Sequence, residues 1–567
     1  MFYLRFLSKS VIFSTTISGY PMKISRRNFI KTAASTAACT TFGFSIYSKP
    51  QTANNSLKIE KIKRPNILYI MSDDHAYQAI SAYGHPISKL ASTPNIDRIA
   101  RKGALFTRNY CANSLCGPSR ACVITGKHSH ANGYMRNDTG TFDGNQLTLP
   151  KVFRANGYQT ALLGKWHIPT DPTGFDFWRI FPGQGSYNNP VMFEPDTSGK
   201  KQSTIYKGYA TDLITDMAIE WMDKKRNKEK PFFFMVHHKA PHRNWIPPER
   251  YYNLFDKVTF PEPENFQDDY SKREAAAHQD MTIIKTLRPV ADLKLFESKE
   301  KRQFPKWIFS STITEEEIQK CVDAYTEKNN QYFEMKAKAG TQWTSEKEKS
   351  WRYQRYLQDY LATIRAVDDS VGKLLDYLEK SGLMENTIIV YASDQGFFLG
   401  EHGWFDKRFM YEESFRMPLM MCYPDQIKPG IIIDELTQNI DFAPTFLDMC
   451  GIKIPEEMQG ISFRKLLNGN KPDQWRKSLY YHYYEYPAEH SVRRHCGVTT
   501  KEWKLIHFYQ QDRWELYHLT EDPMEMNNIY GNFGTETITA KLKQELLSLQ
   551  AQYKVPPELC QKETSAK

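Results

Sequence analysis

The sequence lacks several features that would assign it to a common class of protein. No two of its nine cysteines are spaced C-x-x-C, so the ligand spacing of a zinc site is missing. The cysteines form no regular framework, so no disulfide pair can be assigned, and most thiols are expected to be buried. No internal repeat is visible along the 567 residues. A chain of this length is expected to form two domains, or one large domain with a smaller one attached.

Acidic residues are absent from the first 49 residues, which contain seven Lys or Arg. The whole chain has a net charge of +10, but without this segment 68 basic residues face 65 acidic ones. The rest of the chain is therefore close to neutral, and a nucleic-acid partner is not expected.

The basic segment has the parts of an export signal. Arg26-Arg27 is a twin-arginine pair, and the uncharged residues 32–47 that follow are too short and too polar for a permanent transmembrane anchor. Residues 1–49 are therefore predicted to direct export to the periplasm or the cell surface; a disordered basic tail is the alternative. Residues 36–39 partly match a lipoprotein cleavage box but lack its leucine, so lipidation of Cys39 stays open.

Short apolar runs at residues 65–71, 160–163, 232–237 and 387–393 predict buried strands. Helical patterns separate them, including those at residues 93–102 and 356–378. Strands that alternate with helices indicate an α/β fold, with a large, mostly parallel sheet that helices cover on both faces. In such sheets ligands bind beyond the carboxyl ends of the strands, so the residues there are the first candidates for a site.

Changes in composition predict how the chain is divided. Residues 260–355 are dense in Lys, Glu, Asp and Gln, which indicates helices and long loops inserted in a first domain, residues 62–465. Aromatic-rich runs at residues 478–484, 503–509 and 514–517 predict antiparallel strands, and residues 536–553 predict a closing helix. Residues 466–567 are therefore expected to form a smaller C-terminal subdomain.

Hard oxygen ligands follow two of the predicted strands. Asp73-Asp74 comes after residues 65–71, and Asp394-Gln395 comes after residues 387–393. Carboxylate and amide oxygens suit Ca²⁺ or Mg²⁺ and not zinc. An Asp-Asp pair alone is more often a solvated turn or a helix cap, so the metal prediction depends on the residues around it.

Other polar side chains lie near predicted strand ends or follow a turn. Cys116 precedes a turn-forming proline, and Arg120 comes four residues later. The other candidates are two lysines and two histidines, Lys165, Lys407, His167 and His242. Each of them alone is more often structural. Together with a divalent metal, they form a site for a small tetrahedral oxyanion beside a nucleophile.

These residues belong to motifs that resemble the type I sulfatases of the alkaline-phosphatase-like superfamily, across about residues 62–530. The sulfatase signature Cys-x-Pro-Ser-Arg, followed by Thr-Gly, is matched by residues 116–126. A second element, Gly-Lys-Trp-His, is matched by residues 164–167. The opening Asp-Asp, an Ala-Pro-His element and a Ser-Asp-x-Gly element also occur in the order of the family.

The resemblance implies a secreted sulfatase whose nucleophile is made from Cys116. In this family a maturase oxidises the signature thiol to formylglycine, an aldehyde held as a gem-diol. The resemblance also implies one Ca²⁺ per site, with four ligands: Asp73, Asp74, Asp394 and Gln395.

The same resemblance assigns roles to the remaining candidates. Arg120, Lys165 and Lys407 would stabilise the diol and the sulfate oxygens. One diol hydroxyl would attack sulfur while His242, together with Lys407, protonates the departing sugar oxygen. His167 would then help the second hydroxyl to collapse to the aldehyde, which expels sulfate.

Two positions depart from the family pattern. Gly117 stands where many members have other small residues, and it should be harmless. Gln395 stands where Asn is common. Its amide oxygen can still bind a metal, but its longer side chain would shift the position of that metal.

The substrate is predicted from two further segments. Residues 394–408 and 492–498 resemble bacterial relatives of N-acetylglucosamine-6-sulfatase, which act on host glycans such as mucin and heparan sulfate. That resemblance implies an exo-acting N-acetylglucosamine-6-O-sulfatase in which Arg493 and His495 grip the sugar. The alternative for both side chains is an ordinary contact between domains.

Three other functions stay open. The first is a sulfatase for another polysaccharide, such as an algal galactan or a different position on a glycosaminoglycan. The second is a phosphonate or phosphate ester hydrolase of the same superfamily, which the intact signature and Gly-Lys-Trp-His elements disfavour. The third is a non-catalytic glycan-binding protein, which should have lost a nucleophile or a metal ligand.

Overall fold

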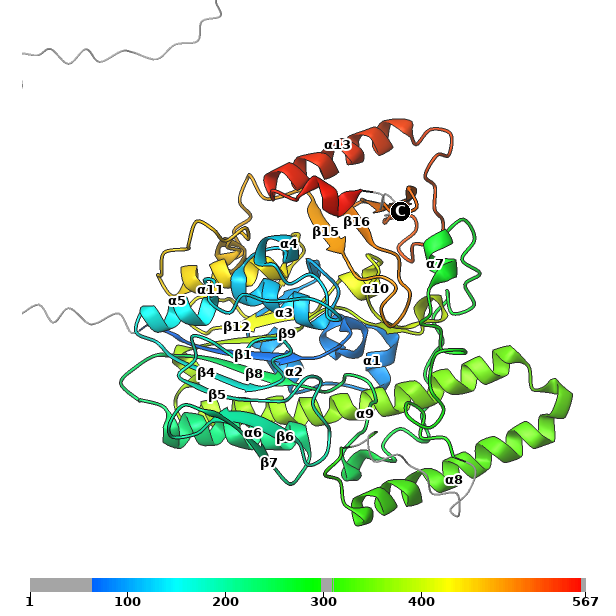
Figure 1. Cartoon of the computed structure of the whole chain (residues 1–567), viewed down its shortest axis with the longest axis horizontal. Coiled ribbons are helices and arrows are strands. Elements are labelled where there is room, and N and C mark those ends of the chain that lie inside the picture. The colour runs from blue at the N-terminus through cyan, green and yellow to red at the C-terminus, as the bar shows by residue number, and fades with distance from the viewer. Residues whose placement is uncertain (1–63, 297–307, 309, 562–567) are drawn as a thin grey trace, which may run out of the picture. The chain divides into compact units, whose positions relative to one another are not determined.

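The computed structural model describes residues 64–296, 308 and 310–561 of the chain (Figure 1). The predicted export signal and Cys39 lie outside the described residues. Within the described residues, no helix combines the length and the apolar character needed to cross a membrane.

A ten-stranded mixed sheet forms the centre of the molecule (Figure 1). Its strands, in spatial order, are β13 (Ile431–Ile433), β2 (Ala104–Phe106), β12 (Leu419–Cys422), β9 (Thr387–Ser393), β1 (Asn66–Ser72), β8 (Phe232–His238), β4 (Gln159–Gly164), β5 (Phe177–Ile180), β6 (Val191–Pro195) and β7 (Lys201–Ile205). The neighbours from β9 to β5 all run parallel. The four strands predicted from apolar runs are β1, β4, β8 and β9, so the predicted α/β fold is confirmed.

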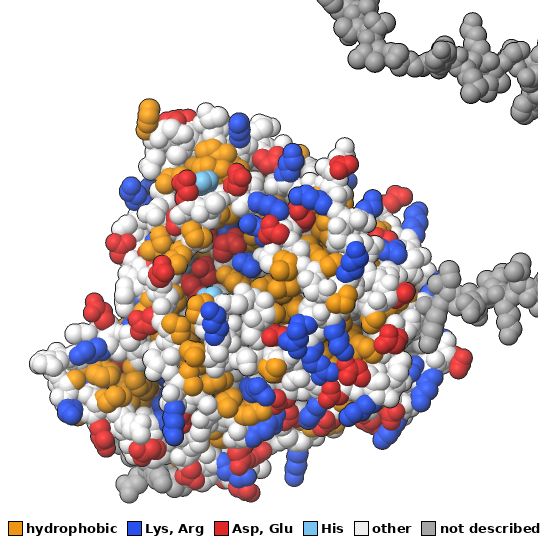
Figure 2. All heavy atoms as spheres, turned by 180° about the vertical axis from the view of Figure 1, so that it is seen from behind, with side chains coloured by type: hydrophobic (Ala, Val, Ile, Leu, Met, Phe, Trp, Pro, Cys, Tyr) orange, Lys and Arg blue, Asp and Glu red, His pale blue; other side chains and the backbone are white. Residues whose placement is uncertain are grey.

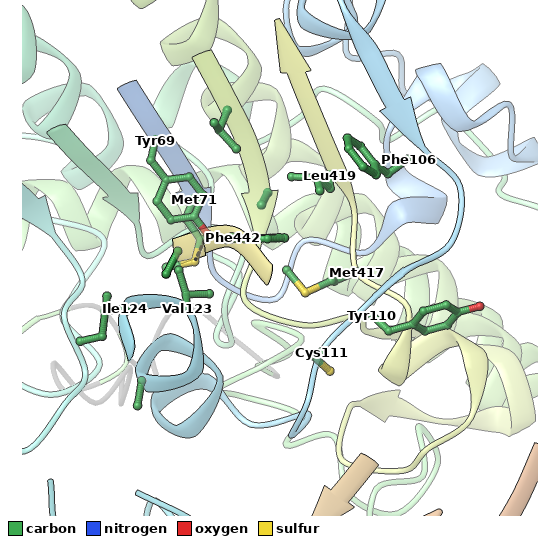
Figure 3. Close-up of a cluster of buried hydrophobic side chains, with 14 of the residues drawn as sticks. Tyr69, Met71, Phe106, Tyr110, Cys111, Val123, Ile124, Met417, Leu419 and Phe442 are labelled. Carbon is green, nitrogen blue, oxygen red and sulfur yellow. Dashed lines mark hydrogen bonds between the residues drawn. The ribbon is translucent and has the colours of Figure 1, made fainter. Parts of the chain in front are cut away.

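Both faces of this sheet are covered, because alternate residues of β1 pack into different apolar clusters. Leu68 and Ile70 pack with α9 (Ser345–Lys380), which runs along one face. Tyr69 and Met71 belong to the cluster on the other face, together with Val123 of α3 (Cys116–Thr125) (Figure 3). A strand buried on both sides has no polar alternation, which explains why β1 is a continuous apolar run.

Shorter elements complete this body. They are α1 (Pro86–Leu90), α2 (Ile96–Lys102), β3 (Asn109–Tyr110), α4 (Ser129–Asn132), α5 (Leu149–Ala155), α6 (Ala210–Glu220), β10 (Phe398–Leu399), β11 (Phe405–Asp406), α10 (Glu412–Phe415), β14 (Thr437–Gln438), α11 (Phe442–Met449) and α12 (Arg464–Leu467).

The charged region predicted as helices and loops contains α7 (Glu274–His278), α8 (Glu315–Ala339) and the first turns of α9. Thr314 and Glu317 form a reciprocal capping box at the start of α8, in which each side chain accepts from the other residue's backbone N–H. The two long helices lie side by side at one edge of the molecule (Figure 1).

The C-terminal part forms a four-stranded antiparallel sheet with a helix over it (Figure 1). The strands are β15 (Leu479–Tyr483), β16 (His495–Thr499), β17 (Trp503–Phe508) and β18 (Arg513–His518), and the helix is α13 (Glu536–Gln552). The sequence predicts three of these strands and the helix, but not β16, which contains Gly497 and few apolar residues. Residues 63–567 form one compact unit, so the boundary at residue 466 stays a prediction.

Candidate active site

The register of the central strands brings the predicted site residues to one edge of the sheet. Ser72, the last residue of β1, lies beside Ser393 at the end of β9 and beside His238 at the end of β8. Gly164, at the end of β4, pairs with His237. The residues that follow these ends therefore meet in space, although Asp74 and Asp394, for example, are 320 positions apart in the chain.

Cys116 reaches this edge from α3. It is the first residue of that helix, after Leu115 in an extended conformation, so the thiol lies at the positive end of the helix dipole. The last turns of α3 are fixed in the core, where Val123 and Ile124 pack below β1 (Figure 3). A Cβ atom at Gly117 would come within 2.6 Å of the side chains of Asn137 and Tyr134, which explains a glycine after the thiol.

The thiol is enclosed by charged groups. Lys407 Nζ lies 3.2 Å from Cys116 Sγ and 2.5 Å from Asp74 Oδ1, and the sulfur is 3.9 Å from that same carboxylate oxygen. Burial, with Asp73 nearby, raises the pKa of Cys116 well above its usual value. The unmodified side chain is therefore held as a thiol, which is a weak nucleophile.

Three carboxylates are buried together here. Burial, together with the neighbouring Asp73 and Asp394 and against the opposing charge of Lys407, raises the pKa of Asp74 to about 7. Burial and Asp73 also raise the pKa of Asp394. Lys165, which forms an ion pair with Asp73, keeps the pKa of Asp73 well below its usual range despite burial. Such a cluster favours a cation bound among the acids.

The donor set fits a hard divalent cation. The carboxylates of Asp73 and Asp74 each offer an oxygen within 4.8 Å of the other, in a group that also contains Cys116 and His242 but not Asp394. Asp73 Oδ1 and Gln395 Oε1 are buried without a hydrogen-bond partner, as expected for oxygens that bind a metal. Gln395 donates its Nε2 to Asp74 Oδ1, so its longer side chain does reach the acids.

Arg120 is buried against the acids and does not line the pocket. Its Nε and Nη2 donate to Asp394 Oδ2 at 3.0 and 2.9 Å, and its Nη1 donates to the Lys165 carbonyl at 2.7 Å. Arg120 thus holds the Asp394 carboxylate and the backbone of Lys165 in place. In this position its positive charge can influence the side chain of residue 116.

The two predicted histidines both line the cavity. His242 Nε2 is 3.7 Å from Asp74 Oδ2, and its Nδ1 is 2.8 Å from the Arg243 carbonyl. His167 Nδ1 is buried without a partner, and the residue has a left-handed backbone, with φ of 56°. Burial and Lys165 lower the pKa of both rings well below the usual value, so both are neutral in this state.

A cavity of about 870 Å³ opens above these groups and is lined by Cys116, His167, His242 and Lys407 among others. We call the charged group at its base the pocket floor: Asp73, Asp74, Cys116, Lys165, Asp394, Gln395 and Lys407. We call five polar side chains that also line the cavity the pocket rim: Asn137, Arg243, Arg408, Glu485 and Glu489. The face shown in Figure 2 mixes Lys and Arg with Asp and Glu, so no field of one sign extends over that face.

Arg408 connects several parts of the rim. Its guanidinium donates to Asp406 Oδ1 at 3.0 Å and to Glu485 Oε2 at 3.1 Å, and only 5% of the residue is exposed. Glu485 also accepts from the backbone N–H of Asn137 and Asp138. Residues 406 and 408 lie in a segment that resembles the family, but neither is among the predicted site residues. Their position on either side of Lys407 is the sequence feature that could have indicated them.

Lys239 is another residue that the sequence analysis missed. It lines the cavity three residues before His242, with its Nζ 5.0 Å from the centre of the Tyr187 ring. Burial, with Lys165 nearby, lowers the pKa of Lys239 to about 7. Lys239 could have been predicted, because it is a lysine just after the end of a predicted strand.

The structure does not bring Arg493 and His495 to the lining of the cavity. His495 is fully buried in β16, where its Nε2 accepts from Met410 N at 3.1 Å and its Nδ1 is 2.7 Å from the Arg493 carbonyl. Arg493 donates to the Tyr486 hydroxyl and lies over that ring, 4.6 Å from its centre. These contacts connect Arg493 and His495 to neighbouring protein groups, and their role in sugar binding stays a prediction.

Residues 65–452 match the family model described as Sulfatase, and residues 400–552 match the one described as N-sulphoglucosamine sulphohydrolase, C-terminal. The first match covers well over half of the chain. The chain belongs to the sulfatase family. This sulfatase is therefore a sulfuric ester hydrolase, as the sequence predicts.

Individual relatives agree with this assignment. The sulfatase is 49% identical, over 507 residues, to an N-acetylglucosamine-6-O-sulfatase of Bacteroides thetaiotaomicron, with 87% of this chain and 88% of that protein covered. It is 26% identical to the goat (Capra hircus) N-acetylglucosamine-6-sulfatase, with 86% and 84% covered. A solved structure in complex with its substrate D-glucosamine-2-N,6-O-disulfate matches with a TM-score of 0.82 and 48% identity, covering 88% of this chain and 99% of that one.

Proposed function

We propose that this sulfatase removes the 6-O-sulfate from terminal N-acetylglucosamine or N-sulfated glucosamine of mucin-type or heparan-type glycans. The observation that supports the chemistry is the buried Cys116 at a helix start, between Lys407 and the clustered carboxylates of Asp73 and Asp74. The choice of sugar rests on the relatives at 49% and 48% identity, which are named for this position or were solved with a 6-O-sulfated glucosamine.

One Ca²⁺ held by Asp73, Asp74, Asp394 and Gln395 is part of this proposal. When bound, the ion would supply positive charge beside the sulfate and the nucleophile. The partnerless Asp73 Oδ1 and Gln395 Oε1 support this ligand set. Lys165 and Lys407, now paired with Asp73 and Asp74, would be released towards sulfate oxygens.

The nucleophile is proposed to be formylglycine made from Cys116 by a maturase. The raised thiol pKa supports this step, because an unmodified Cys116 would be mostly protonated and poorly reactive near neutral pH. Residues 1–49 are proposed to export the enzyme to the periplasm or cell surface.

The reaction then proceeds in two steps, and a different histidine assists each step. A hydroxyl of the formylglycine diol attacks sulfur and gives its proton to solvent, the bond from sulfur to the sugar oxygen breaks, and His242 delivers a proton to that oxygen. His167 next accepts the proton of the second hydroxyl, the aldehyde C=O re-forms, and the C–O bond to sulfate breaks. Addition of water restores the diol.

Proton delivery requires His242 to be charged. In this state burial lowers its pKa, but His242 Nε2 faces Asp74 and the cavity. An anionic sulfate beside the ring would favour the protonated form and prepare it for proton delivery.

The test begins with the mass of the peptide that contains Cys116, after expression with a maturase. Conversion of thiol to aldehyde lowers that mass by about 18 Da, and an unmodified thiol in an active enzyme would overturn the proposal.

Sulfate release should then be compared among 6-sulfo-N-acetylglucosamine, 6-sulfogalactose and the 2- and 3-sulfated glucosamines. The first compound should be hydrolysed at least about 100-fold faster, in kcat/KM, than the others. Equal rates would leave the sulfatase assignment intact but contradict the sugar.

A further inference from the structure

Two of the scattered thiols approach each other in the C-terminal part of the chain. Cys496 lies in β16 and is fully buried, while Cys560 ends the short helix at Pro557–Cys560 and is partly exposed. Gln550 of α13 lies between them, with its Nε2 3.7 Å from Cys496 Sγ and 3.3 Å from Cys560 Sγ. Cys560 also packs against the apolar cluster that contains Cys496.

The surroundings of Cys560 favour its reaction. The Tyr480 hydroxyl lies 3.9 Å from Cys560 Sγ. The Cys496 thiol has the largest effect on Cys560, and together with His482 and Tyr480 it lowers the pKa of Cys560 to about 4 against the effect of burial. A partly exposed thiolate beside a second, buried thiol is the arrangement of an attacking and a resolving cysteine.

Two other described thiols that lie near each other, Cys111 and Cys122, each contact an oxygen atom. Cys111 Sγ lies 3.4 Å from the Phe415 carbonyl, and Cys122 Sγ lies 3.6 Å from the Ser129 hydroxyl. Both are fully buried, so an oxidant would have no access to them.

We propose that Cys496 and Cys560 form a disulfide that fastens the C-terminal end of the chain to β16. This modification site is independent of the sulfatase chemistry at Cys116. A small or protein disulfide is the oxidant. The Cys560 thiolate attacks one of its sulfurs, a mixed disulfide forms and one thiolate leaves. The Cys496 sulfur, after losing its proton, attacks Cys560 Sγ and expels the second thiolate. Two thiols thus lose two protons and two electrons, and the oxidant becomes two thiols.

The bond would cross-link β16 to the end of α13 and its following helix. Leu542, Leu546 and Leu549 of α13 already pack over the C-terminal sheet with Cys496. A covalent closure between residues 496 and 560 would restrict the unfolded chain and keep this helix in place. We therefore expect the oxidised protein to unfold at a higher temperature than the reduced one.

The experiment uses the full chain, purified in reducing buffer and then exposed to oxidised glutathione in its native state. The protein is quenched in acid, unfolded, alkylated and digested, and the peptides with Cys496 and Cys560 are located by mass. A linked pair, about 2 Da lighter than the sum of the two free peptides, is expected. Alkylation of both thiols, or glutathione on Cys560 with Cys496 still free, would overturn the proposal.

Two variants separate the bond from general effects of thiol loss. C560S should abolish the linked peptide and the oxidant-dependent rise in unfolding temperature, while its reduced form should unfold close to the reduced wild type. C422S is the matched control, because Cys422 is buried in β12 and lies outside the apolar cluster of Cys496. The oxidant should still raise the unfolding temperature of C422S; a rise that also persists in C560S would contradict the assignment.

Discussion

The pocket floor and the pocket rim are built in different ways. Most side chains of the floor follow the ends of the parallel strands β9, β1 and β4, joined by Cys116 from α3 and Lys407 from the segment after β11, and its acids are fully buried. The rim comes from loops of four distant segments and is held by an ion-pair network around Arg408. A buried charge cluster is fixed by the sheet and suits the common chemistry of a family, whereas loops can change without disturbing that chemistry. We therefore expect the floor to carry out the reaction and the rim to select the sugar.

Loss of the nucleophile should have the largest effect. C116A should lower kcat by a factor on the order of 10⁶ for every sulfate ester, because no group remains to form the covalent intermediate. The measurement is sulfate release from both an aryl sulfate and 6-sulfo-N-acetylglucosamine. C122A, on the same helix with its thiol towards Ser129, is the matched control and should keep its activity. Residual turnover by C116A above background would mean that another group attacks sulfur.

Loss of a carboxylate that is proposed to bind the metal should have the second largest effect. D394N should reduce kcat by about 10³-fold with both substrates, since it weakens the proposed Ca²⁺ site and frees Arg120 from its partner. Calcium titrations followed by thermal unfolding give a readout apart from activity. Ca²⁺ should raise the unfolding temperature of the chelator-treated wild type and have little effect on D394N. An equal rise in both proteins would place the ion elsewhere.

The proposed acid should show a dependence on the leaving group. H242A should lower kcat for the hydrolysis of 6-sulfo-N-acetylglucosamine by about 100-fold, because a sugar alkoxide needs a proton as it departs. An activated aryl sulfate, whose phenolate leaves without help, should be affected much less. The ratio of the two losses is the measurement. Equal losses would indicate that His242 positions the floor through Asp74 instead of donating a proton.

The floor could be predicted from the sequence because its residues lie beside strong local patterns. Continuous apolar runs define β1 and β9, and sequence order places Asp73 and Asp394 at their ends. The rim could not be predicted in the same way. Glu485 meets Arg408 across 77 residues, and no local periodicity encodes that contact. His495 was chosen from its motif, but its position in the unpredicted strand β16 turns it into the apolar interior.

Loss of a rim side chain should have the smallest effect on activity. It is also the most direct test of whether floor and rim have different functions. In the wild type, Arg408 holds the carboxylates of Asp406 and Glu485, which could then be oriented towards sugar hydroxyls. R408A removes the charge that holds them. It should raise KM for 6-sulfo-N-acetylglucosamine by about 10-fold, with a smaller change in kcat, and leave an aryl sulfate nearly unchanged. R464A is the matched control, because Arg464 pairs with Asp448 outside the cavity lining. If R408A lowered kcat equally for both substrates, Arg408 would belong to the reaction machinery, and the division between floor and rim would fail.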